Sequence, residues 1–111
     1  MLDSDEETST LLEKEEDVAL YEFIGRIGPR GREKEGKITL FDDEFEIDDR
    51  GKKVRMSYYN IMSWEHGKIL WRMHYKILQS THTVEFYPLN DPADLSKAIR
   101  EVVRLIQNRN M

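Results

Sequence analysis

Apolar and polar residues alternate along most of the chain, in short runs that turn-forming residues separate. Every second residue is apolar in such runs, which is the period of a strand with one buried face. The runs cover residues 19–27, 37–41, 45–47, 52–56, 61–64, 68–78 and 81–87. Their separation by short polar turns predicts about seven antiparallel strands.

The predicted turns are the loop Gly28–Gly31, the interruption Asp42-Asp43, and the turns Asp49-Arg50-Gly51, His66-Gly67 and Gln79-Ser80. Glycine accepts the positive φ that tight hairpins require, so Gly67 is expected to make such a turn. A two-residue turn at Gln79-Ser80 would pair Tyr75 with Val84 and Met73 with Phe86. It would also place His74 opposite Glu85.

A helix is predicted after the last strand. Asp91 can cap the free N–H groups of its first turn, and Pro92 suits the first helical position. One apolar stripe follows and consists of Leu95, Ala98, Ile99, Val102 and Ile106, with the helix ending near Asn108. Such a helix can cover the open end of a curved sheet. The fold class is therefore mainly β (α+β), a curved antiparallel sheet or partly open barrel capped by a C-terminal helix.

Charge divides the chain of 111 residues into two parts. Residues 1–17 hold eight acids and one lysine, whereas the rest of the chain carries slightly more bases than acids. Dense like charge with little apolar surface predicts a disordered acidic leader over 1–17, followed by one domain over 18–111. The chain has no cysteine, no signal-peptide pattern and no apolar run of membrane-spanning length, so we expect a cytoplasmic protein.

Three segments resemble a known family. Gly36–Ile47 is similar to the second and third strands of pleckstrin-homology-like domains, in the broad sense that includes GRAM domains and prokaryotic relatives. Tyr58–Glu65 resembles a later strand of the same family, and the helix from Pro92 resembles its terminal helix. The resemblance implies a curved sheet closed by that helix, in a family that is diverse in sequence and function, so the fold does not fix the function.

Several motifs of catalytic or metal sites are incomplete. Gly31–Lys37 matches the start of a phosphate-binding P-loop, but Ile38 stands where the magnesium-binding hydroxyl belongs and begins a strand. His66, His74 and His82 are too evenly spread to converge on a metal, and the acids between residues 42 and 49 lack calcium-loop spacing. Ser63 and His66 lie on one segment without an orienting third group. We therefore expect no enzyme, no metal and no cofactor.

A basic cluster around the first loop is the main candidate site: Arg26, Arg30, Arg32, Lys34 and Lys37, with a second group at Arg50, Lys52, Lys53 and Arg55. The expected function is a non-catalytic adaptor whose basic cluster recognises another protein or an acidic peptide. The alternative is a phospholipid headgroup at a membrane surface, because lipid-binding members of the resembled family carry basic residues there. Arg30 and Arg32 match part of that pattern, whereas Glu35 departs from it.

We expect no nucleic-acid partner, since the domain is barely cationic and counterion release rewards many phosphate contacts. The identity of the partner, the pathway and the oligomeric state stay open at this point. The sequence also leaves open whether the basic cluster binds a partner or only keeps the loop soluble.

Removing residues 1–17 should leave stability almost unchanged, because their charge pattern offers the core little to bury. We expect the chain that begins at Val18 to melt within a few degrees of the full chain in a thermal unfolding experiment followed by circular dichroism. A large fall in the melting temperature would instead show that Leu11 and Leu12 are docked on the domain.

Overall fold

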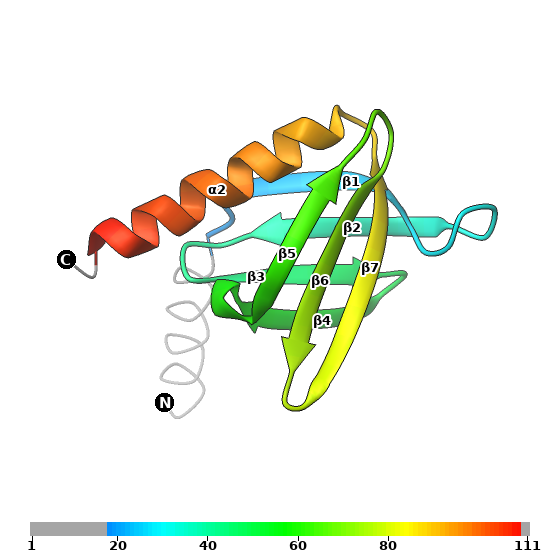
Figure 1. Cartoon of the computed structure of the whole chain (residues 1–111). Coiled ribbons are helices and arrows are strands. Elements are labelled where there is room, and N and C mark those ends of the chain that lie inside the picture. Colours follow the sequence, from blue (N-terminus) through cyan, green and yellow to red (C-terminus); the bar gives the residue numbers. More distant parts are fainter. Residues whose placement is uncertain (1–17, 110–111) are drawn as a thin grey trace, which may run out of the picture.

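The computed structural model describes residues 18–109, so the prediction for residues 1–17 lies outside the described part. Seven strands, a short 3-10 helix and an α-helix follow one another (Figure 1). They are β1 (Tyr21–Ile27), β2 (Lys34–Leu40), β3 (Glu44–Asp49), β4 (Lys52–Ser57), η1 (Tyr58–Asn60), β5 (Ile61–His66), β6 (Trp71–Ile77), β7 (Ser80–Pro88) and α2 (Pro92–Arg109). The predicted strands and terminal helix are confirmed.

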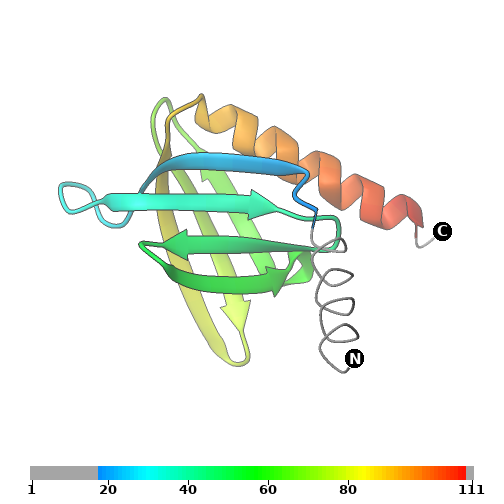
Figure 2. The same ribbon diagram turned by 180° about the vertical axis from the view of Figure 1, so that it is seen from behind.

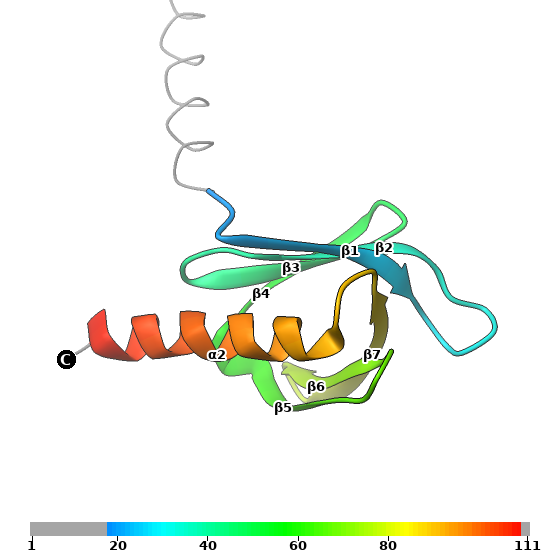
Figure 3. The same cartoon turned by 90° about the horizontal axis from the view of Figure 1, so that it is seen from above.

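All strand pairs are antiparallel, in the order β4-β3-β2-β1-β7-β6-β5. The sheet is not closed, because β4 and β5 are its two ends. Figures 1 and 2 show β5–β7 crossing β1–β4 steeply, so the sheet is bent into two halves that face each other. Seen from above, α2 lies along one side of the space between the halves (Figure 3). The predicted fold class is confirmed.

The helix closes one side of the core, as its apolar stripe predicts. Asp91 caps it, since its carboxylate accepts a hydrogen bond from the Ala93 N–H at 3.0 Å. All five residues of the predicted stripe are buried. Ser96 joins the helix to the sheet, because its hydroxyl accepts the indole N–H of Trp71 at 3.1 Å and lies 2.9 Å from Nδ1 of His66. Within residues 18–109, no helix has the apolar length that a bilayer crossing requires.

Two glycines make the bend of the sheet. Gly25 and Gly36 are cross-strand partners in β1 and β2. A Cβ on Gly25 would lie 2.2 Å from the carbonyl oxygen of Tyr87 in β7, and a Cβ on Gly36 would lie 2.8 Å from the side chain of Ile27. The β7 backbone therefore crosses β1 where β1 has no side chain, which allows the two halves to join at a steep angle.

The predicted register of the β6–β7 hairpin is wrong: it is shifted by two residues from the observed one. The turn is Leu78-Gln79, because Ile77 pairs with Ser80, and Leu78 has a φ of 57°. Tyr75 consequently pairs with His82 rather than Val84, and Met73 pairs with Val84 rather than Phe86. Burial of Trp71 opposite Phe86 sets this register, and the buried face is the same in both registers because the shift is even.

The shift also changes two polar partners. His74 lies opposite Thr83, and Arg72 takes the predicted place opposite Glu85. The turn before β6 differs as well, since Gly67 donates its N–H to Leu70 and the chain reverses at Lys68 and Ile69. Gly67 does not have the positive φ expected of it. The strand therefore begins at Trp71, whose side chain is fixed in the core, and not at Lys68.

Gly25→Ala should destabilise the fold severely, because the added methyl group meets backbone atoms that no side-chain rotation can move. We expect a loss of on the order of 3 kcal/mol in the free energy of unfolding, measured by urea denaturation. Gly67→Ala is the matched control, since its added Cβ would come no closer than 4.0 Å to the nearest atom. Equal stability of the two variants would contradict this account of the bend.

Ile99→Ala should cost about 2–4 kcal/mol of stability, because Ile99 is 1% exposed beneath the helix. Arg100→Ala, on the exposed face of the same helix, should cost less than about 0.5 kcal/mol. Chemical denaturation of both variants measures the difference, and equal losses would mean that the helix does not close the core.

Candidate functional site

The five predicted basic residues do not converge on one point. Arg26 lies in β1, Lys34 and Lys37 lie in β2, and the connecting loop carries Arg30 and Arg32. Because side chains alternate along a strand, Lys34 lies on the same face of β2 as the buried Ile38 and Leu40, but past the end of the core. Arg26 and Lys37 lie on the opposite face of the sheet. A single anion would therefore meet only part of the cluster.

The loop between β1 and β2 is held by its own polar groups. Arg26 donates to the carbonyl oxygen of Glu33 at 2.9 Å, and the Glu33 carboxylate accepts from the Gly31 N–H at 2.6 Å. Backbone N–H groups of Glu33 and Gly31, followed by Arg26 and Arg30, hold the pKa of Glu33 below its usual range. Glu33 thus stays ionised within the loop and opposes the positive charge of Arg30.

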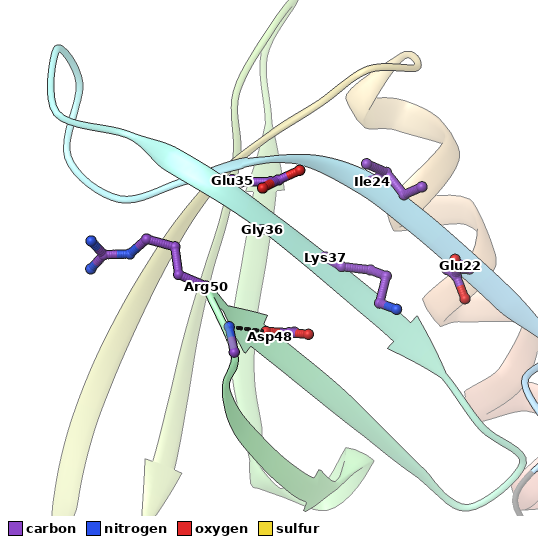
Figure 4. A pocket seen from close by; sticks show the side chains of 8 residues that line it. Glu22, Ile24, Glu35, Gly36, Lys37, Asp48 and Arg50 are labelled. Carbon is purple, nitrogen blue, oxygen red and sulfur yellow. Dashed lines mark hydrogen bonds between the residues drawn. The ribbon is translucent and has the colours of Figure 1, made fainter.

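Lys37 lies in a shallow trough on the outer face of β1–β3. The trough has a volume of about 450 Å³ and is lined by Glu22, Ile24, Glu35, Gly36, Lys37, Asp48, Arg50 and Gly51. Figure 4 shows Lys37 between Glu22 and Asp48, with Arg50 pointing away from it. Three carboxylates and two cations, Lys37 and Arg50, line the trough, and this excess of negative charge disfavours a phosphate at Lys37.

A second depression opens between the two halves of the sheet, away from α2. We call it the open-end groove; it has a volume of about 290 Å³. Its apolar lining comes from both halves of the sheet: Ile27 and Ile47 from one side, Tyr75 and Val84 from the other, and Val54 from β4. Gly28, Pro29, Asp49, Lys52, Thr83 and Glu85 complete the lining.

The polar residues of the open-end groove carry both signs of charge. Glu85 forms an ion pair with Arg72 at 2.8 Å, and Asp49 forms one with Arg50 at 3.3 Å. Lys52 is the cation that lines the groove itself. An apolar floor with balanced charges at its margin suits a protein segment better than a multiply charged headgroup.

The groups with catalytic or metal-binding potential are separated. His66 is beside Ser96 and α2, His74 bonds Thr83 on the outer face at 2.8 Å, and His82 stacks on Tyr75 with 5.3 Å between ring centroids. Ser63 pairs with His74 and so lies on the other face of β5 from His66. No group of three His, Asp or Glu residues within 18–109 has the arrangement of a metal site.

Two features of the site were missed from the sequence. The open-end groove joins residues of β1, β3, β4, β6 and β7, so no local pattern announces it. The Ser96–His66–Trp71 cluster also joins distant segments, and only a serine on the apolar side of the predicted helix signals it. Ser96 is 2% exposed, so its hydroxyl serves packing and is not accessible to a substrate.

No family model matches the chain, and no curated protein matches it. Among solved structures, it is similar to the crystal structure of the C-terminal domain of an unknown protein from Leishmania infantum. The TM-score is 0.62 and the sequence identity 11%, over 86% of this chain and 93% of that one. At this identity the likeness is one of fold alone: a seven-stranded antiparallel sheet with a C-terminal helix, compatible with the pleckstrin-homology-like architecture.

Proposed function

We propose that this chain is a non-catalytic, pleckstrin-homology-like interaction module that binds a segment of another protein in the open-end groove. The observation that carries the proposal is Val54, an apolar residue on the concave side of the sheet that is 39% exposed at the groove. Apolar surface of this kind gains free energy when a partner's side chain covers it. The groove is large enough for one or two such side chains.

The charge around the groove suggests which segments it prefers. Arg30 and Arg32 lie in the loop that begins with the groove residues Gly28 and Pro29. Acidic residues that flank an apolar anchor would be attracted to these two side chains. The expected ligand is therefore a short segment with one large apolar residue and acidic neighbours.

Peptides selected from a random display library against the full chain test this proposal. Selected peptides should carry an apolar anchor and acidic flanks, and they should bind Val54→Asp about tenfold or more weakly, since a buried charge replaces apolar contact. Ile24→Asp is the matched control, because Ile24 is 52% exposed on the outer face and lies outside the groove. Circular dichroism is the check that both variants are folded.

The membrane alternative predicts a different result. Binding to vesicles that contain anionic lipid should then be strong, salt-sensitive and lost in Arg30→Ala and Arg32→Ala, with no effect of Val54→Asp. That pattern, or peptide affinity unaffected by Val54→Asp, would overturn the proposal of a protein-binding groove.

A further inference from the structure

One half of β7 has a free backbone edge. In the β6–β7 hairpin, Ile77 and Ser80 close a two-residue turn, so the even-numbered residues of β7 exchange backbone hydrogen bonds with β6. The N–H and C=O groups of Thr81 and Thr83 therefore point to the opposite side. On that side β1 pairs only with residues 86–88, and the Gly28 N–H bonds the Glu85 carbonyl at 3.0 Å.

The pairing between β1 and β7 stops at Ile27 and Phe86 for a local reason. Gly28 has a φ of 122° and turns β1 away from β7, and Pro29 has no N–H to donate. Among the residues that the structure describes, no strand pairs with Thr81 and Thr83 on this side. The free edge borders the open-end groove, which Thr83, Val84 and Glu85 help to line.

This edge lacks the features that usually prevent pairing with another chain. Residues 80–84 are Ser-Thr-His-Thr-Val, with no proline, no lysine and no bulge. The edge of β4, by contrast, begins with Lys52-Lys53, and β5 has an irregularity at Met62 between Ile61 and Ser63. Threonine and valine also favour extended pairing.

Leu78, at the tip of the same hairpin, has an unfavourable solvent exposure and an unfavourable backbone conformation in the isolated chain. Its side chain is 90% exposed, and its φ of 57° belongs to the region that asparagine or glycine adopts more easily. Neither feature stabilises the free domain. An apolar environment around Leu78 in a complex would compensate for both.

We propose that two copies of this chain associate by antiparallel pairing of their β7 edges, about a two-fold axis at His82. In this register Thr81 of each copy lies opposite Thr83 of the other, which pairs the free N–H and C=O groups of both residues. The contact is the same from both sides, as a two-fold dimer requires.

Ile27 of β1 already occupies the position opposite Phe86, so the pairing ends with Ser80 of each copy opposite Val84 of the other. Leu78, at the hairpin tip just beyond Ser80, then lies beside the end of β1 at Gly28 and Pro29, which line the open-end groove. The groove volume of about 290 Å³ accommodates a leucine side chain. Charge does not oppose the contact, because residues 66–84 contain no acid while Asp49 and Glu85 stand at the groove.

The pairing uses the groove of the proposed function, so a second copy and a partner segment would compete for it. Self-association therefore also regulates access to that groove. The two proposals nevertheless fail separately, since one predicts a dimer and the other predicts binding of a foreign peptide.

Sedimentation equilibrium of the full chain over ~1 µM to ~1 mM tests the dimer. We expect reversible dimers for the natural sequence. Thr83→Pro should be monomeric, because it removes an N–H at the free edge without removing one from the β6 pairing. Thr83→Val is the matched control: it loses the hydroxyl contact to His74 but keeps the N–H, and it should still dimerise.

Leu78→Asn keeps the test decisive if the proline variant does not fold. It should weaken dimerisation about tenfold or more and leave the melting temperature of the monomer unchanged or higher, because asparagine suits the turn. Ile69→Asn is its control, as Ile69 is 62% exposed at the β5–β6 turn, and this variant should dimerise normally.

Three outcomes would overturn the proposal. The first is that the natural chain is monomeric at every concentration. The second is that it dimerises and neither Thr83→Pro nor Leu78→Asn affects the dimer. The third is that the chain is monomeric and Leu78 is needed only for binding to anionic vesicles. A monomeric natural chain that still binds selected peptides in a Val54-dependent manner would leave the proposed function standing and exclude self-association alone.

Discussion

The close passage of β7 over Gly25 is the constraint on which the rest of the structure depends. The carbonyl oxygen of Tyr87 occupies the space that a side chain at position 25 would take. Because β7 crosses there, the residues of β5–β7 that face inward meet those of β1–β4, and one core forms between them. A flat sheet of the same strands would expose this face to water.

The bend also decides where the molecule is closed and where it is open. On one side α2 fills the gap, fixed by Ser96 near its start and by Arg109 near its end, where Arg109 donates to the Asp42 carbonyl at 2.9 Å. On the other side the part of β7 that precedes Phe86 is not paired with β1, and the space between the halves becomes the open-end groove. The crossing of β7 over β1 at Gly25 therefore determines both the side that α2 covers and the side on which the groove opens.

The sequence predicted the elements well because their causes are local. Alternation gives the strands, Asp91 and Pro92 give the helix start, and the spacing of Leu95 to Ile106 gives its buried face. The register of β6–β7 was not predicted correctly, since several polar dipeptides near Gln79 resemble turns and only the packing of Trp71 against Phe86 distinguishes them. A turn with leucine at positive φ breaks the usual preference and could not be expected from composition.

The candidate site was less predictable for the same reason. Proximity in sequence suggested that Arg26, Arg30, Arg32, Lys34 and Lys37 form one cluster, but strand alternation distributes them over two faces and a loop. The open-end groove is assembled from residues of five strands. Its existence depends on the angle at Gly25, which no periodic pattern encodes.

The narrow seam between β1 and β7 has a consequence for how the chain reaches its native state. Every other strand pair joins neighbours along the chain, whereas Gly25 to Ile27 pair with Pro88 to Phe86 from the far end of the sheet. Loop-closure entropy opposes this one contact most strongly, so the hairpins can form early while the seam waits for the chain ends to meet. We therefore expect the docking of the two meanders at this pair of glycines to be the late step of folding.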